Sequence, residues 1–330
     1  MMDNSNRNRV LGLYNILTKY SDEKHQLTMK QILDYMEQEG LGCSADSIAR
    51  YMNQLRNEFG VDIISSMGRN ASYFIGERML QKAELKLLID AINASNFVER
   101  KTAKRICDKL KDTVSIHEQC ELDRNVMGLS NTKTENTTIL YNVDSIQDAF
   151  NKKQQIEFDY LAWSKDKKLV DKDKSYVLNP WALIWANGRY YLYGYNDENG
   201  VLVERHYRVD KMRNVETNGI SRSGSEQFKK FDPNAYVSKR IGMFSGQEEK
   251  IVVKIDDSLV GAFIDQFGKG IDIKDSEENN KLIVTFEVVV TELLLGWFIG
   301  LGNVEVLKPD LVREKMINLI KLNMKRYGDG

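Results

Sequence analysis

The chain has 330 residues, enough for two to four domains, and its hydrophobic fraction of 42% is typical of a soluble globular protein. Lys and Arg number 47 against 48 Asp and Glu, so any nucleic-acid surface must be a local patch rather than a consequence of bulk charge. The three cysteines, Cys43, Cys107 and Cys120, are widely spaced and form no C-x-x-C pair. This pattern favours reduced thiols and argues against a disulfide framework or a zinc site. We therefore predict neither a metal nor a cofactor.

The sequence indicates neither a targeting segment nor a membrane segment. Its polar start, MMDNSNRNR, lacks the apolar core of a signal peptide. The most apolar stretch, residues 282–301, carries Glu287 and Glu292 and changes midway from a period of two to a helical period. That change predicts a strand followed by a helix rather than a membrane span. We expect a cytoplasmic protein without membrane contact.

Residues 1–76 predict three helices followed by a hairpin. Thr28 begins a capping-box pattern that opens the second helix, and Ser44 stands at the N-cap position of the third. Two β-branched runs, 61–64 and 72–75, lie on either side of a turn and predict the hairpin. This order of elements is that of a winged helix-turn-helix domain, which binds double-stranded DNA.

The third predicted helix separates apolar from polar residues. Its apolar side chains have helical spacing and are expected to be buried: Ile48, Met52, Leu55 and Phe59. The opposite face is rich in Arg, Asn and Gln, which bind base edges in the major groove, while the hairpin would contact a phosphate. The residues that we predict to contact DNA are Ser44, Asp46, Ser47, Arg50, Asn53 and Gln54, with Arg69 in the hairpin. A helical protein-interaction domain is the alternative interpretation.

Residues 77–136 predict a helical connector. Leu85, Leu88 and Ile92 have the spacing of one buried helix face. The stretch SNTKTENTT at residues 130–138 is polar and has no apolar periodicity. It therefore predicts a linker and a domain boundary.

Residues 187–212 predict a second hairpin, because two aromatic and β-branched runs flank a cluster of Asn, Asp and Gly. Side chains alternate between the faces of a strand, so a buried Leu192 leaves Tyr191, His206 and Arg208 on the opposite face. A tyrosine ring beside a guanidinium suits a nucleobase and a phosphate. The alternative is that Arg208 makes only internal hydrogen bonds within a structural barrel.

This hairpin resembles the core of WYL domains. Tyr190-Tyr191-Leu192 stands at the family's Trp-Tyr-Leu triplet, and Tyr207-Arg208-Val209-Asp210-Lys211 resembles its Phe-Arg-Leu-Asp-Arg strand. The resemblance implies a small Sm-like or SH3-like barrel over residues 137–220, with Tyr191 and Arg208 facing the ligand. The strand at residues 156–160 resembles the family's first strand. The predicted ligand-binding residues are Tyr160, Tyr191, Tyr193, His206 and Arg208.

The flanking regions extend the resemblance. Ser47-Ile48-Ala49-Arg50 resembles the Thr-Ile/Val-x-Arg of the DeoR-type winged helix that usually precedes WYL domains. Residues 221–330 predict a βαββαβ order with an added final helix, which is a ferredoxin-like fold. Within them, residues 295–302 and 304–309 resemble the C-terminal extension found with WYL domains. The predicted fold class is therefore a multidomain α+β protein.

The resemblance implies a ligand-responsive transcriptional regulator. Its expected partners are operator double-stranded DNA and an effector that is a nucleotide or a short nucleic acid. We expect a homodimer, because a single recognition helix reads too few base pairs for useful specificity. Repression is favoured over activation, and several members of the family lie beside anti-phage defence genes.

Two alternative functions would also use the Sm-like barrel but do not involve transcriptional regulation. The first is a nucleic-acid-processing enzyme, which needs clustered carboxylates or a nucleophile beside a histidine base. The sequence contains no Walker loop, H-E-x-x-H or G-x-S-x-G pattern, so we predict that the chain is not an enzyme. The second is an RNA-binding protein, which the predicted recognition helix argues against.

Overall fold

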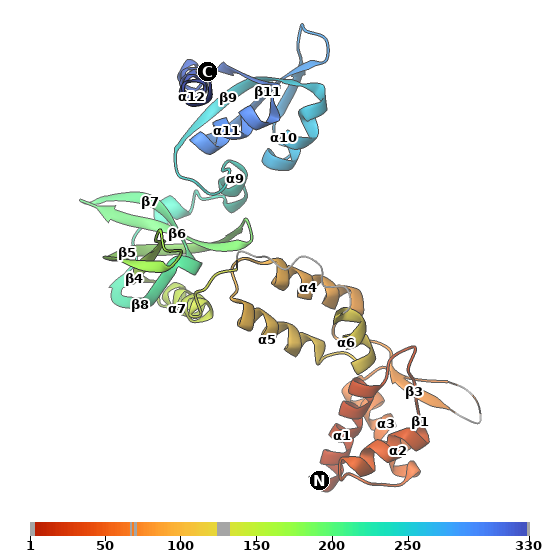
Figure 1. Cartoon of the computed structure of the whole chain (residues 1–330). Helices are drawn as coiled ribbons and strands as arrows, with labels where there is room; N and C mark the ends of the chain where they lie inside the picture. The colour runs from red at the N-terminus through yellow and green to blue at the C-terminus, as the bar shows by residue number, and fades with distance from the viewer. Residues whose placement is uncertain (1–3, 67, 69–70, 124–132, 329–330) are drawn as a thin grey trace. The chain divides into compact units, whose positions relative to one another are not determined.

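The computed structural model describes residues 4–66, 68, 71–123 and 133–328 (Figure 1). It shows a mixed α+β protein with several antiparallel sheets. The chain divides into two compact units, one made of Met1–Val143 with Leu161–Val170 and the other of Asp144–Tyr160 with Asp171–Gly330. Among the described residues, no helix has the length and apolar character needed to cross a membrane.

The first unit begins with a bundle of helices beside a small sheet, which we call the N-terminal bundle. The sheet has the strand order β1-β3-β2. The predicted capping box of Thr28 is confirmed, and Ser44 caps the third helix by accepting from the Ser47 N–H at 3.3 Å. The elements are α1 (Asn4–Tyr20), β1 (Leu27–Thr28), α2 (Met29–Gln38), α3 (Ala45–Phe59), β2 (Ile63–Ser65) and β3 (Ser72–Ile75).

The core of the N-terminal bundle differs from the prediction at the end of α3. Ile48, Met52 and Leu55 are buried as expected, but Phe59 is 64% exposed and its predicted burial is wrong. Phe59 lies in the last turn of α3 and helps to line a mostly apolar hollow between α1 and α3. Tyr51 is buried instead, because its hydroxyl donates to Asn6 Oδ1 at 2.9 Å and is thereby satisfied inside the bundle.

The connector consists of α4 (Lys82–Ala94), α5 (Arg100–Lys111) and α6 (Ile116–Asp123). Leu88 is 40% exposed, so its predicted burial is wrong. The neighbouring Ile89 is buried instead. Of the predicted linker, residues 130–132 lie outside the described residues. Its residue Lys133 contacts the end of α4, where Lys133 Nζ donates to the carbonyls of Ile92 and Ser95 at 3.2 and 2.9 Å.

A sheet with the strand order β7-β6-β5-β4-β8 lies mostly in the second unit, while the end of β4 and the start of β5 fall within residues 161–170 of the first. The predicted hairpin is confirmed as β6 paired with β7, and its turn at Asn199-Gly200 has φ angles of 58° and 83°. These left-handed angles are those that an Asn-Gly hairpin turn adopts. The elements are α7 (Ile139–Lys152), β4 (Gln154–Trp163), β5 (Leu169–Ala186), β6 (Arg189–Glu198), β7 (Val201–Arg208), η1 (Val209–Lys211), β8 (Met212–Ser221), α8 (Ser225–Phe228) and α9 (Pro233–Ser238).

The C-terminal part of this unit has a second sheet, with the strand order β10-β11-β9-β12. One of its faces carries a core that includes Ile251, Phe263, Val284 and Phe298. Alternation in β9 and β11 places every second residue in this core. The elements are β9 (Gln247–Asp256), η2 (Asp257–Leu259), α10 (Val260–Phe267), β10 (Asp272–Asp275), β11 (Lys281–Val290), α11 (Glu292–Leu301), β12 (Val304–Lys308) and α12 (Asp310–Tyr327).

Candidate functional site

Arg208 ends β7 and is held by a carboxylate two residues further on. Its Nε donates to Asp210 Oδ1 at 3.0 Å, and its Nη2 donates to Asp210 Oδ2 at 2.6 Å. Asp210 is 3% exposed, while the Arg208 side chain is 28% exposed. Burial alone lowers the pKa of Arg208, but the hydrogen bonds and charge of Asp210 outweigh it and the pKa is raised. The arginine is therefore both fixed in position and partly open to solvent.

Further cations surround the same carboxylate. Arg189 Nε lies 3.8 Å from Asp210 Oδ2, and this buried nitrogen has no hydrogen-bond partner within the described part of the chain. Lys211 follows directly, and its pKa is lowered by burial and by the charge of Arg208. We call Arg189, Arg208 and Lys211, together with Asp210, the cation cluster. Because its positive charges outnumber the one carboxylate, the cation cluster attracts anions.

Tyr160 and Tyr191 border the cation cluster. Tyr191 is directly opposite Arg208 in the β6–β7 pairing, and the Tyr160 hydroxyl accepts from the Arg208 backbone N–H at 3.3 Å. Burial raises the pKa of Tyr160 to about 12 and raises that of Tyr191, where the charges of Arg208 and Arg189 oppose the shift. Both phenols therefore stay neutral near neutral pH, where they can donate a hydrogen bond to an anion.

Tyr193 and His206 lie apart from the cation cluster, beneath the segment that follows β8. His206 Nδ1 pairs with the Tyr236 hydroxyl at 2.8 Å, and His206 Nε2 pairs with the Met243 carbonyl at 2.6 Å. A carbonyl only accepts, so Nε2 carries the proton and neutral His206 accepts at Nδ1. Tyr193 is 1% exposed and stacks on Phe231 with ring centroids 4.1 Å apart. The structure therefore places Tyr160 and Tyr191 beside Arg208. Tyr191 is itself only 6% exposed and packs in the same cluster as Tyr193, while residues 228–243 cover Tyr193 and His206.

His206 gives a testable pH dependence of stability. Burial is the main cause that lowers its pKa below the ordinary 6.5, so the unfolded chain takes up this proton first on acidification. The stabilisation that neutral His206 gives to the folded state is thus complete above its ordinary pKa. It is lost as the pH falls towards the lowered pKa of His206 in the folded protein. We expect thermal melts from about pH 7.5 to about pH 5.5 to show a steeper loss for the parent than for His206→Gln. Equal slopes would contradict this role, since both proteins retain the other histidines.

A hollow of about 600 Å³ lies beside these covered residues. Its lining includes Tyr193, Glu204 and Tyr236, with Arg240 Nη2 donating to Glu204 Oε1 at 3.1 Å. The Arg240 guanidinium lies over the Tyr236 ring at 3.5 Å from its centroid. Sequence patterns did not indicate this hollow, because its two walls come from β6–β7 and from residues 226–248.

The predicted DNA-binding residues lie along α3 and its N-terminus. Ser44, Asp46, Arg50 and Asn53 are exposed, whereas Ser47 is half-buried at the cap. Gln54 is also half-buried, and its Nε2 donates to Glu58 Oε2 at 2.8 Å, so it lies to the side of that exposed surface. The predicted contact at Arg69 lies outside the described residues.

Sequence reasoning missed Arg189, Asp210 and Lys211. Asp210 and Lys211 stand in the same short motif as Arg208, and Arg189 begins the strand that carries Tyr191. The signal that could have identified them is the spacing Arg208-x-Asp210. A buried carboxylate two residues after an arginine needs a positive partner.

Comparisons with known proteins identify two regions of the chain. A WYL domain model matches residues 141–217, and a WCX domain model matches residues 247–322. A comparison with curated proteins gave no match.

Two solved structures are similar to the chain. Proteasome accessory factor B/C (PafBC) of Arthrobacter aurescens is 17% identical with a TM-score of 0.28, over 97% of this chain and 46% of that chain. A CRISPR Cas-related protein is 12% identical with a TM-score of 0.36, over 98% of this chain and 85% of that chain. The chain thus spans about half the length of PafBC.

Proposed function

We propose that this WYL-domain protein, which also carries a WCX domain, is a ligand-sensing transcriptional regulator that binds double-stranded DNA. The observation that carries the proposal is the cation cluster, in which Arg189, Arg208 and Lys211 surround the buried Asp210 beside neutral phenols. Such a site binds an anion. Ligand binding at this site must act on another part of the protein. The N-terminal bundle has an exposed polar helix face of the kind that reads DNA.

The proposed effector is a nucleotide or a short nucleic acid. Arg208 is the arginine predicted to bind phosphate, and its side chain, held by Asp210, is 28% exposed. Tyr160, which is half-buried, would add a ring contact, and the neutral hydroxyls of Tyr160 and Tyr191 would add donors. Arg189 adds a second positive charge beside Asp210, with its Nε 3.8 Å from Asp210 Oδ2.

The proposed output domain is a winged helix-turn-helix in which α3 is the recognition helix and the β2–β3 hairpin is the wing. Ser44, Asp46, Ser47, Arg50, Asn53 and Gln54 keep their proposed role in DNA contact. We also propose an Sm-like barrel for the WYL domain and a ferredoxin-like fold for the WCX domain. The strand order β10-β11-β9-β12, with α10 and α11 as crossovers, supports the second assignment.

We further propose a cytoplasmic homodimer that acts as a repressor, in keeping with the pairing of half-sites by most helix-turn-helix proteins. Control of anti-phage defence genes is part of the same proposal. A binding protein is favoured over an enzyme, because the phenols beside the cation cluster stay neutral near neutral pH and its one carboxylate, Asp210, is engaged by two hydrogen bonds from Arg208.

The test is selection of duplex DNA from a random pool by the full-length protein, followed by titration of the selected sequence with and without short oligonucleotides. We expect enrichment of an inverted repeat and a change in DNA affinity when an oligonucleotide is present. Absence of any enriched sequence would contradict the regulator. Enrichment from an RNA pool alone would instead favour an RNA-binding barrel.

A further inference from the structure

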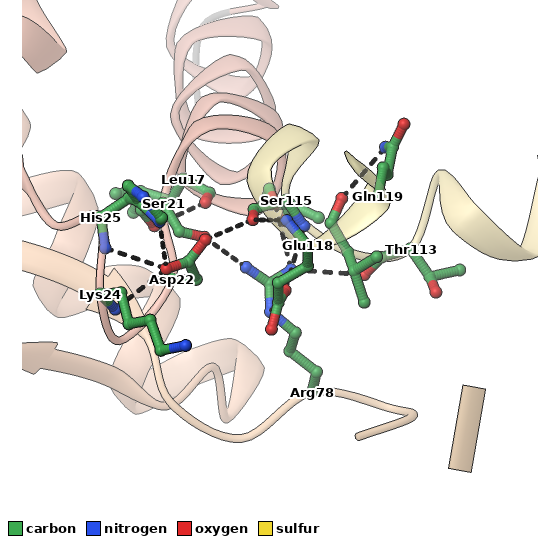
Figure 2. Close-up of polar contacts among 12 residues, drawn as sticks. Leu17, Ser21, Asp22, Lys24, His25, Arg78, Thr113, Ser115, Glu118 and Gln119 are labelled. Carbon is green, nitrogen blue, oxygen red and sulfur yellow. Dashed lines mark hydrogen bonds and ion pairs between the residues drawn. The ribbon is translucent and has the colours of Figure 1, made fainter. Parts of the chain in front are cut away.

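A buried carboxylate forms a hydrogen bond between the N-terminal bundle and the connector (Figure 2). Asp22 follows α1 and is 6% exposed. Its Oδ2 accepts from the Ser115 Oγ of the connector at 2.5 Å, and its Oδ1 accepts from the backbone N–H groups of Lys24 and His25 at 2.9 Å each. Burial alone would raise the pKa of Asp22, but these hydrogen bonds, together with one from His25 Nδ1 to Oδ1 at 2.9 Å, lower it. The carboxylate is therefore charged and fully engaged on both sides of the contact.

Arg78, in the segment after β3, adds hydrogen bonds between the bundle and the connector at the same place (Figure 2). Its side chain is 8% exposed. Nη2 donates to the Ser21 carbonyl at 2.6 Å, while Nη1 donates to the carbonyls of Thr18 and Thr113 at 3.1 and 3.3 Å. A cation at the end of α1 is also favoured by the helix dipole. Arg78 thus joins the C-terminal end of α1 to the segment that follows α5.

A second set of contacts lies beside the first. The rings of His25 and His117 stack with centroids 3.8 Å apart and an interplanar angle of 15°. Lys24 Nζ lies 3.7 Å from Glu121 Oε1. A single contact would act as a pivot, whereas contacts at separate points resist rotation about any one of them. The bundle and the connector therefore meet at several separate contacts.

We propose that Asp22, Arg78 and Ser115, which we call the bundle–connector joint, make the N-terminal bundle and α4–α6 one rigid DNA-reading unit, with Arg78 as its positioning residue. The inference rests on the proposed function, because it concerns how two reading units in a dimer meet two half-sites. An added base pair moves one half-site by about 3.4 Å and turns it by about 34°. A rigid unit cannot follow that movement, so DNA with the altered spacing binds more weakly. The bundle–connector joint therefore determines which half-site spacing the protein binds.

The first test measures rigidity without DNA. Spin labels are placed on the exposed Cys120 of α6 and on Lys30→Cys of α2, in a Cys43→Ser background that leaves the buried Cys107 unlabelled. We expect a narrow distance distribution in this parent and a broad one in Arg78→Gln and Ser115→Ala. The matched control is Arg105→Gln, which removes the same charge from an exposed position on α5.

The second test measures spacing. Each protein selects duplex DNA from a random pool, and the affinity for the selected repeat is compared with that for the same repeat carrying one extra base pair. We expect the parent and Arg105→Gln to prefer the original spacing by about tenfold or more. Arg78→Gln and Ser115→Ala should lose that preference while still binding a single half-site as well as the parent does.

The outcomes distinguish a failure of the role of the bundle–connector joint from a failure of the proposed function. Unchanged label distances and unchanged spacing preference in both variants would overturn the role of the bundle–connector joint. If the parent enriches no DNA, the proposed function fails, and the label distances alone decide whether the unit is rigid. Should Arg78→Gln fail to fold, as a melting curve would show, Ser115→Ala decides, since it removes only one side-chain hydroxyl.

Discussion

Arg208→Ala is expected to lower the free energy of unfolding by about 2 to 3 kcal/mol and to abolish binding of a short oligonucleotide to the WYL domain. The stability loss follows because Asp210, 3% exposed, loses both of its hydrogen bonds from Arg208. The loss of binding follows because the cation cluster loses its partly exposed guanidinium. Chemical denaturation and a titration with labelled oligonucleotide measure the two effects separately.

A double variant distinguishes the structural role of Arg208 from its binding role. Arg208→Ala combined with Asp210→Ala removes the buried carboxylate together with its partner, so most of the lost stability should return. Binding should stay absent. The matched control is Arg205→Ala, because Arg205 lies on the same strand and its pair with Glu198 is half exposed. If the double variant regains oligonucleotide binding, Arg208 is structural and the effector binds elsewhere.

Arg50→Ala is expected to weaken binding to the selected DNA by about 1 to 3 kcal/mol while leaving the melting temperature unchanged. Arg50 is exposed on α3, and its guanidinium lies 5.4 Å from the centre of the Tyr51 ring. Its loss therefore removes the group that we propose reads bases, without removing a core side chain. Band-shift titrations on the selected sequence and on an unrelated duplex measure the change in specificity.

The control for Arg50→Ala is Arg313→Ala, which removes an equal charge from the exposed surface of α12. We expect this control to bind both duplexes as the parent does. If Arg50→Ala weakens binding to the two duplexes equally, Arg50 contacts phosphates and does not read bases. If it weakens neither, α3 is not the recognition helix.

The sequence by itself determined the features that depend on neighbouring residues. Thr28 and Ser44 cap α2 and α3 because their side chains accept from backbone groups about one turn away. Asn199-Gly200 turns β6 into β7 because both residues tolerate left-handed φ angles. The alternation of residues along β6 and β7 likewise placed Tyr191 opposite Arg208.

Only the tertiary structure decided which of these residues are covered and which are partnered. Tyr193 and His206 share strands with Tyr191 and Arg208, yet residues 228–243 cover the first pair and leave Arg208 partly exposed. The carboxylate of Asp22 meets Ser115 across 93 residues of sequence. Periodicity specifies the face of an element on which a side chain lies, but it carries no information about the distant segment that packs there. The cation cluster and the bundle–connector joint therefore emerged only when strands and helices far apart in the chain were brought together.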